Sequence, residues 1–168
     1  MTKIPISIRS MEKTDWNKVV EIYKQGMETG NATFQHEVPV WEDWDRGHLS
    51  YCRFVAKIGN EVVGWSALSP VSSRCVYSGV AEVSVYVSTN YRGQKVGSLL
   101  LRKLIDESEE NNIWTLQAGI FPENTPSIKI HEQHGFRQIG HREKIGNMNG
   151  VWRDTLLFEK RSTKIGIS

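Results

Sequence analysis

The sequence has little of several features that mark special classes of protein. Its two cysteines, Cys52 and Cys75, form no Cys-x-x-Cys pair, so we expect neither a disulfide framework nor a zinc or other metal site. No stretch approaches the ~18 apolar residues that a membrane-spanning helix needs, and residues 1–11 lack the apolar segment of a signal peptide. We therefore expect a cytoplasmic protein that does not act at a membrane.

Net charge is also low. The formal charge is +2, from 21 Lys and Arg against 19 Asp and Glu, and the two signs are interspersed. A nucleic-acid-binding domain normally carries a stronger basic footprint, so we expect small-molecule partners and no nucleic acid. With 168 residues, 39% of them hydrophobic, the chain is long enough to form one domain (residues 1–168) with a core of its own.

Hydrophobic periodicity predicts alternating strands and helices along the whole chain. Gly59-Asn60 and the segment 146–150 supply the turns of two hairpins, and Gly30 and Gly135 are helix stops. The predicted strands are residues 5–11, 52–58, 61–69, 80–88, 112–120, 137–145 and 151–160, and the predicted helices are residues 14–30, 41–47, 94–111 and 124–135. This order predicts a mixed α/β domain of the α+β kind, a mixed sheet with helices on both faces.

The segment YRGQKVGSLLLRKLIDE, residues 91–107, joins a predicted strand directly to a predicted helix. The first N–H groups of a helix have no partners within the helix and carry the positive end of its dipole, which makes this loop a site for a phosphate-like anion. Neither the Gly-x-Gly-x-x-Gly nor the P-loop fingerprint is present. A glycine-containing turn with no ligand is the alternative for the loop taken alone.

Several separated motifs together carry a resemblance to a known family. The strand, the Arg-Gly-Gln-Lys-Val-Gly loop, the long helix and the later Asn-x-x-Ser helix ending in His-Gly-Phe resemble the acetyl-CoA-dependent N-acetyltransferases of the GNAT superfamily. Residues 21–35, 81–88, 129–136 and 151–154 are similar to the phosphinothricin acetyltransferase group, which includes methionine sulfone and sulfoximine acetyltransferases. The resemblance implies a mostly antiparallel GNAT-like sheet, acetyl-CoA as co-substrate without a metal, direct acetyl transfer in a ternary complex, and a homodimer.

The resemblance also implies which residues bind acetyl-CoA. Lys95 departs from the family pattern, because it stands where a glycine is usual, and this puts the loop geometry in question. Asn124 and Ser127 match positions that bind the pantetheine arm, although both are also common helix-start residues. The complete implied set is Val85, Tyr86, Val87, Arg92, Gly93, Gln94, Lys95, Val96, Gly97, Ser98, Asn124 and Ser127.

Acetyl transfer needs groups that move protons. An α-amine is largely protonated near neutral pH, so a carboxylate is useful as a base; Glu82 is the candidate, with a surface or paired glutamate as the alternative. His131 stands where many family members have a tyrosine that protonates the leaving thiolate, and simple packing is the alternative. His134 is interpreted as a helix-end cation.

Substrate-binding residues are less clearly marked. Arg74 suits the substrate carboxylate, with Tyr77 nearby, although a solvated loop arginine is the commoner case. Phe34 is a candidate pocket wall or an ordinary core residue.

Besides acetylation of a small amino-acid analogue, the sequence leaves open a peptide N-terminal acetyltransferase and a non-catalytic acetyl-CoA sensor. A closing segment at Trp41 and Trp44 would disfavour the open groove that a peptide needs.

Overall fold

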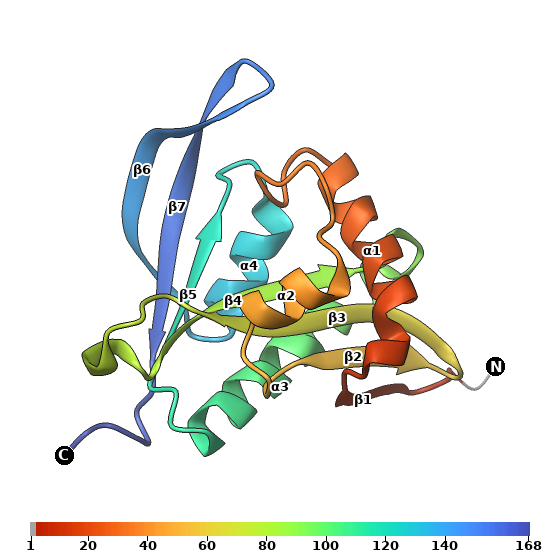
Figure 1. Cartoon of the computed structure of the whole chain (residues 1–168), viewed down its shortest axis with the longest axis horizontal. Helices are drawn as coiled ribbons and strands as arrows, with labels where there is room; N and C mark the ends of the chain where they lie inside the picture. The colour runs from red at the N-terminus through yellow and green to blue at the C-terminus, as the bar shows by residue number, and fades with distance from the viewer. Residues whose placement is uncertain (1–2) are drawn as a thin grey trace.

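The computed structural model describes residues 3–168 as a mixed α/β domain, a seven-stranded sheet with helices on both faces (Figure 1). The predicted fold class is confirmed; residues 1 and 2 of the predicted domain lie outside the described part. The strands are β1 (Ile6–Ser10), β2 (Phe54–Ile58), β3 (Glu61–Pro70), β4 (Val80–Val87), β5 (Thr115–Ile120), β6 (Arg137–Met148) and β7 (Val151–Arg161). The helices are α1 (Trp16–Glu28), α2 (Trp41–Gly47), α3 (Val96–Glu110) and α4 (Thr125–Gln133).

The sheet has the order β1-β2-β3-β4-β5-β7-β6, and β4–β5 is its one parallel pair within residues 3–168. This pair is short, running from Val80 opposite Thr115 to Glu82 opposite Gln117. Beyond that point β4 continues to Val87 and β5 to Ile120 without pairing to each other. The two strands therefore diverge in the middle of the sheet, next to the N-terminal ends of α3 and α4.

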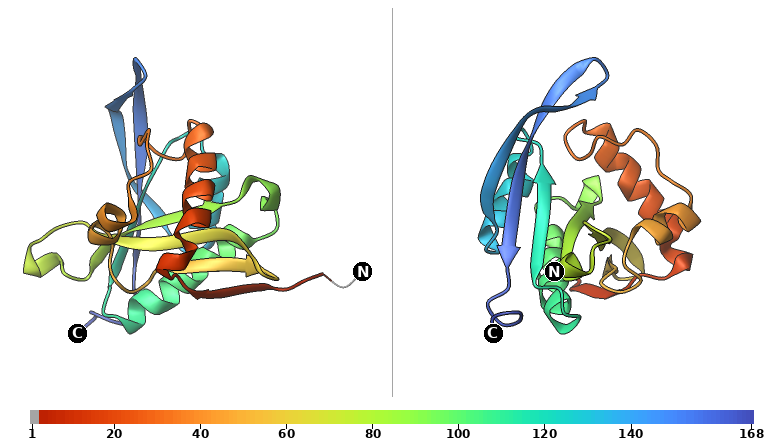
Figure 2. Two further views of the ribbon diagram at one scale, coloured as in Figure 1. Left: turned by 45° about the vertical axis from the view of Figure 1, so that its right-hand side comes forward. Right: turned by 60° about the vertical axis from the view of Figure 1, so that its left-hand side comes forward.

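Each face of the sheet has its own hydrophobic core. On one face α1 and α2 pack over β2 and β3, and on the other α3 packs over the same strands and β4 (Figure 2). The first core contains Met11, Val19, Ile22, Tyr23, Trp44, Val55, Val62, Trp65 and Ala67. The second includes Phe54, Val63, Leu68, Val83, Leu100, Leu101, Leu104, Phe136 and Phe158. Because β3 contributes to both cores, its side chains are buried on both faces.

Three boundaries differ from the sequence-based expectations. The helix predicted from residue 94 begins at Val96, because Lys95 adopts a left-handed conformation with φ of 68°. The helix predicted from residue 14 begins at Trp16, and the Asp15 side chain before it makes no cap bond; its carboxylate accepts from Arg9 and from the Glu12 N–H. The final hairpin turns at Asn149–Gly150, and its strands run through much of the predicted 146–150 turn and project beyond the rest of the sheet (Figures 1 and 2).

None of the helices that the structure describes is long and apolar enough to cross a bilayer.

Candidate functional site

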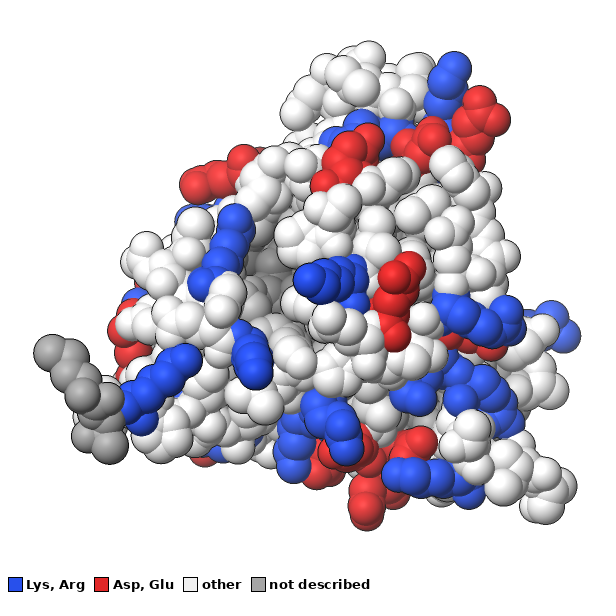
Figure 3. All heavy atoms as spheres, turned by 180° about the vertical axis from the view of Figure 1, so that it is seen from behind, with Lys and Arg blue, Asp and Glu red and all other residues white. Residues whose placement is uncertain are grey.

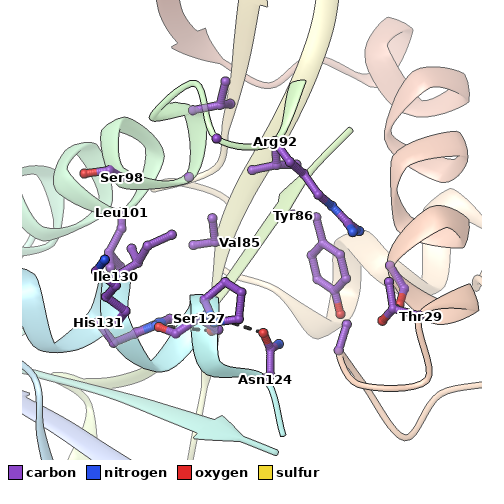
Figure 4. A pocket seen from close by; sticks show the side chains of 18 of the residues that line it. Thr29, Val85, Tyr86, Arg92, Ser98, Leu101, Asn124, Ser127, Ile130 and His131 are labelled. Carbon is purple, nitrogen blue, oxygen red and sulfur yellow. Dashed lines mark hydrogen bonds between the residues drawn. The ribbon is translucent and has the colours of Figure 1, made fainter. Parts of the chain in front are cut away.

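A cavity of about 1070 Å³ opens where β4 and β5 diverge. Its walls are the end of α1 with the loop that follows, the end of β4, the loop and first turns of α3, and α4 (Figure 4). Figure 3 shows the opposite side of the molecule from Figure 1, with a hollow bordered by Lys and Arg side chains. The lining residues include Thr29, Asn31, Val85, Tyr86, Val87, Arg92, Gly93, Lys95, Val96, Gly97, Ser98, Asn124, Ser127, Lys129 and His131.

The loop before α3 presents unpaired backbone donors to this cavity. Within residues 3–168, none of the N–H groups of residues 92–98 has a hydrogen-bond partner, and the first bond of the helix is Leu99 N–H to Lys95 O at 3.0 Å. Gly93 and Lys95 both have positive φ, which turns the chain sharply into the helix. The loop therefore has the form that an anion site at a helix N-terminus requires.

The conformation of Lys95 shows how a lysine fits at a position where the family usually has glycine. It takes the left-handed conformation that glycine adopts most readily, so the loop keeps a glycine-like path although a lysine stands there. Lys95 is also one of the basic residues that line the cavity, with Arg92 and Lys129. In Figure 4 the Arg92 side chain points from its loop toward the end of α1 at Thr29.

Tyr86 forms the aromatic wall of the cavity. Its ring stacks on Trp65 with centroids 4.8 Å apart and an interplanar angle of 9°, and on Tyr23 at 4.8 Å. Burial raises the pKa of the Tyr86 hydroxyl, so it is uncharged near neutral pH. Gly26 of α1 faces the ring so closely that a Cβ there would lie 2.6 Å from two ring carbons.

Asn124 caps α4 and also ties that helix to the loop after α1. Its Oδ1 accepts from the Ser127 N–H at 3.3 Å, and its Nδ2 donates to Asn31 O at 3.0 Å. The helix-start interpretation of Asn124 is thus correct for its side-chain oxygen. Asn124 and Ser127 nevertheless both line the cavity, so the implied contact with a pantetheine arm stays a prediction.

His131 is the buried ionisable group of the cavity. Its Nδ1 is 2.7 Å from Ser127 O, a carbonyl that can only accept, so Nδ1 carries the proton and Nε2 a lone pair. Among the described residues Nε2 has no hydrogen-bond partner and is buried, and burial lowers the pKa of the ring. The neutral ring is therefore a hydrogen-bond acceptor at Nε2, and it must first gain a proton before it can serve as the predicted donor.

His134 differs from its expected role as a helix-end cation. Its Nε2 lies 2.7 Å from Ser98 Oγ and links the end of α4 to the first turn of α3. Burial, together with the nearby charges of Arg102 and Lys160, lowers the pKa of its ring. His134 is thus a neutral link between two helices near pH 7.

Glu82 lies at the fork of the sheet and does not line the cavity. Its side chain is exposed, and Gln117 Nε2 donates to its Oε2 at 3.2 Å. In the structure Glu82 is therefore a paired glutamate, as the alternative interpretation expected. Val85, three residues further along β4, already borders the cavity.

The three predicted substrate residues lie outside the cavity, as does Gln94 of the loop. The Arg74 guanidinium lies over the Tyr77 ring at 5.7 Å in the exposed turn before β4. Phe34 packs edge-on against Phe121, with ring centroids 4.8 Å apart, and covers Gly146 of β6. Phe34 and the Arg74–Tyr77 pair thus have different neighbours.

Sequence reasoning missed three residues that shape the site. Gly26 had a detectable signal, since glycine inside a helix is costly and often marks a close approach. Lys129 had none beyond its place on a predicted helix. Arg153 of β7 bonds to Gly30 O and Asn31 Oδ1, each at 2.9 Å, a contact across more than 120 residues that no local pattern indicates.

Trp41 and Trp44 do not form a closing lid. Trp44 is buried on Trp65 and His48, and Trp41 packs against Trp16 and Trp44. The argument against an open peptide groove that rested on these tryptophans is therefore wrong.

In the part of the chain that is described, no group of three or more His, Cys, Asp or Glu side chains is arranged to hold a metal ion.

Comparison with known proteins gives consistent matches. Residues 16–136 match the family model described as Acetyltransferase (GNAT) family. YwnH of Bacillus subtilis, provisionally named a phosphinothricin acetyltransferase, is 34% identical over 150 residues, 86% of this chain and 92% of that protein. The phosphinothricin N-acetyltransferase of Streptomyces viridochromogenes is 27% identical over 93% of this chain and 87% of its own. The L-methionine sulfoximine/L-methionine sulfone acetyltransferase of Salmonella typhimurium is 28% identical, with coverages of 92% and 93%.

Solved structures share the fold over nearly the whole chain. The ribosomal-protein-alanine N-acetyltransferase of Brucella melitensis has a TM-score of 0.84 at 29% identity, over 93% of this chain and 99% of that one. The yncA protein of Salmonella typhimurium, solved with its cofactor acetyl-CoA, has a TM-score of 0.83 at 25% identity, over 93% of both chains. This chain therefore belongs to the acetyltransferase (GNAT) family and is an N-acetyltransferase.

Proposed function

We propose that the protein transfers the acetyl group of acetyl-CoA directly to the α-amine of a small amino-acid analogue, of the phosphinothricin or methionine sulfone and sulfoximine type, within a ternary complex. The observation that carries the proposal is the cavity at the β4–β5 fork, which ends on the unpaired N–H groups of residues 92–98. The amino-acid analogues named for relatives over most of this chain support the substrate class.

The residues around the cavity fit acetyl-CoA. The N–H groups of residues 92–98 and the cations Arg92, Lys95 and Lys129 suit its pyrophosphate. Val85, Tyr86 and Val87 pair with β3 on one side and are free of β5 on the other, which suits an extended polar arm. His131 Nε2 is a buried acceptor without a partner, so it suits a donor on the ligand.

Two side chains are proposed to move protons. Glu82 accepts the proton that the amine must lose, because it is a carboxylate at the fork with open access to solvent. His131 takes up a proton from solvent at Nε2 and donates it to the leaving thiolate; burial lowers the pKa of its ring, which makes the protonated form a strong donor. Arg74 is proposed to pair with the substrate carboxylate, through a guanidinium whose present contact is the Tyr77 ring.

We also propose that the enzyme works in the cytoplasm as a homodimer. Both cysteines are free thiols, as expected in a reducing compartment. Val151 and Trp152 are exposed near the end of the β6–β7 hairpin and offer apolar surface to a second copy. Light scattering tests this state, and a monomeric mass at working concentration contradicts it.

A turnover assay tests the proposed activity. Purified protein is incubated with acetyl-CoA and a panel of amines, and release of the free thiol is followed. The panel contains phosphinothricin, methionine sulfone, methionine sulfoximine, ordinary amino acids, the decarboxylated amines and a peptide with an N-terminal alanine. The proposal expects the amino-acid analogues to lead, and turnover confined to other classes contradicts it.

Acetylation of peptide N-termini is the second candidate. It is favoured by the likeness to the Brucella melitensis ribosomal-protein-alanine N-acetyltransferase and by the absence of a tryptophan lid at α2. The alanine peptide in the same panel separates the two candidates. Family membership sets the non-catalytic alternative aside.

A further inference from the structure

Arg153 on β7 uses its guanidinium to contact two other segments, the loop after α1 and the segment before α4. Nη1 donates to Gly30 O at 2.9 Å, and Nη2 donates to Asn31 Oδ1 at 2.9 Å and to Glu123 Oε2 at 3.3 Å. The guanidinium also lies over the Phe121 ring, 4.2 Å from its centroid. With only 15% of its side chain exposed, Arg153 is an internal clamp and not a solvated surface charge.

The loop that it holds has little backbone support of its own. Within residues 3–168, the segment 31–39 makes no backbone–backbone hydrogen bonds. Its position depends on side chains, among them Arg153 and Asn124, whose Nδ2 donates to Asn31 O. Such a segment opens more easily than a helix or strand unless those contacts are kept.

A second contact joins the same loop to the same hairpin. Phe34 covers Gly146 so closely that a Cβ there would lie 2.7 Å from the ring. Gly146 is paired with Arg153 in the β6–β7 register. The loop is therefore held at two neighbouring points by one pair of residues on the hairpin.

This loop is a wall of the functional site. Asn31 and Ala32 line the cavity, as do Glu123 and Asn124 on the segment to which Arg153 ties them. In Figure 4 the end of α1 at Thr29 lies across the cavity from Ser98 and α3. Because the unpaired N–H groups that suit a pyrophosphate are on the α3 side, the loop borders the space that remains for the amine.

We propose that Arg153 is a positioning residue for the amine substrate: it fixes the loop 30–34 against the start of α4 and thereby sets where the amine binds. The inference rests on the proposed acetyltransferase function. Arg153 does not line the cavity, so it acts through Asn31 and Gly30. A lysine cannot replace it, since an ammonium is a point charge and does not fork to two acceptors on one segment and a third on another.

The test compares Arg153→Lys and Arg153→Ala with a control on the same hairpin, Arg142→Lys, whose residue is exposed on β6. The amine probes are methionine sulfoximine and phosphinothricin. We expect both Arg153 variants to raise the amine KM by about 10- to 100-fold, the scale of a small misplacement of a reactant. The Kd for acetyl-CoA, measured by calorimetry, and the melting temperature of Arg153→Lys should stay close to wild type, as should every property of Arg142→Lys.

Chemical rescue separates positioning from general stability. Millimolar guanidinium should refill the space left in Arg153→Ala and lower its amine KM, with no such effect on Arg153→Lys, whose side chain still occupies the site. An Arg153→Lys enzyme with the wild-type amine KM overturns the inference. The inference is also overturned if a variant loses acetyl-CoA affinity, melts at a lower temperature and has a raised amine KM all at once.

The experiment distinguishes failure of the Arg153 role from failure of the proposed function. If wild-type enzyme acetylates the amines and Arg153→Lys does so equally well, the role of Arg153 is wrong and the proposed function stands. If wild-type enzyme acetylates none of them, the proposed function is overturned and the assignment of Arg153 falls with it.

Discussion

Glu82 and Gln117 form the last pair of the parallel β4–β5 ladder, and their side chains are joined by a 3.2 Å hydrogen bond from Gln117 Nε2 to Glu82 Oε2. Immediately beyond this pair the strands separate and the cavity begins. The carboxylate therefore stands where the sheet opens, exposed to solvent, so in its proposed role as the base it can pass the amine proton on to water.

Replacing Glu82 with glutamine tests this role. We expect Glu82→Gln to keep acetyl-CoA affinity and to lower turnover by about 10²–10⁴-fold, the usual contribution of a general base. The deficit should shrink as pH rises, because the free amine becomes more abundant. Initial rates between pH 6 and 9.5, with Gln117→Leu as a control that removes only the hydrogen bond, provide the measurement. A deficit that is constant with pH would indicate a structural role.

Lys95 allows charge and backbone conformation to be separated. Its left-handed φ of 68° costs a non-glycine residue about 1–2 kcal/mol. Lys95→Gly removes that strain but adds entropy to the unfolded chain, so we expect a net change in unfolding free energy within about 1 kcal/mol. Acetyl-CoA binding should weaken several-fold at low salt and less at high salt, because a charge near the anion is lost.

Lys95→Ala is the matched variant for that experiment. It removes the same charge and keeps the strain, so it should match Lys95→Gly in affinity and be the less stable of the two. Calorimetry at two salt concentrations and urea unfolding measure both properties. Equal losses of affinity at low and high salt would show that the ammonium does not act on the ligand through its charge.

Gly26 is expected to be intolerant of even a methyl group. A Cβ at this position would lie 2.6 Å from Cδ1 and Cε1 of Tyr86, and the ring cannot easily retreat because Trp65 stacks behind it. We expect Gly26→Ala to lower the unfolding free energy by about 1–3 kcal/mol, as overpacking does. Gly47→Ala, where a Cβ would meet nothing within 4 Å apart from its chain neighbours and its own helix backbone, is the control. Equal stability of the two variants in urea would contradict the packing argument.

Local features were the predictable part of this fold. The alternation in β4 sends Val83 and Glu82 to opposite environments, one buried and one exposed, as a strand must. Asn124 caps α4 through a bond to a residue three positions away, a pattern readable in the sequence. Trp44, by contrast, is a core residue of α2 whose role depends on Trp65, so its place in a polar, aromatic segment was misleading.

The assembled site was less accessible from the sequence. The anion loop follows from a helix start, but the fork at Glu82 and Gln117 was not predicted, because strand pairing is a long-range property. Arg153 illustrates the limit, since its partners Gly30 and Asn31 belong to a loop without a regular pattern. Lys95 is a different case. The loop keeps its left-handed conformation at this position, although the residue type there is not the usual glycine.

The buried His131 ring is expected to make the unfolding free energy fall at acid pH. Burial lowers the pKa of its ring in the folded protein below the unfolded value of about 6.5. As pH falls through about 6.5, the unfolded chain binds a proton that the folded chain does not, so the unfolding free energy decreases. We expect His131→Asn to lose this part of the decline, while His48 and His134, whose pKa values burial also lowers, keep theirs. Urea unfolding at pH 7.5 and 5.5 measures the difference, and an unchanged decline in the variant contradicts it.

Arg74 decides the substrate class if it pairs with the α-carboxylate. Its guanidinium lies over the Tyr77 ring in an exposed turn outside the cavity, so this pairing requires the substrate to extend beyond the cavity toward that turn. An amino-acid analogue should then exceed its decarboxylated amine in kcat/KM by roughly 10- to 150-fold, since a lost charge-assisted hydrogen bond costs about 1.5–3 kcal/mol.

The Arg74→Ala variant should erase that preference and leave acetyl-CoA binding intact, with the exposed Arg46→Ala as control. Steady-state kinetics with each pair of acid and amine measure the preference directly. A variant that still discriminates would show that another cation holds the carboxylate. Wild-type enzyme that acetylates simple amines or peptide N-termini as well as amino acids would show that the proposed substrate class is wrong, because in those substrates no free α-carboxylate is available to be recognised.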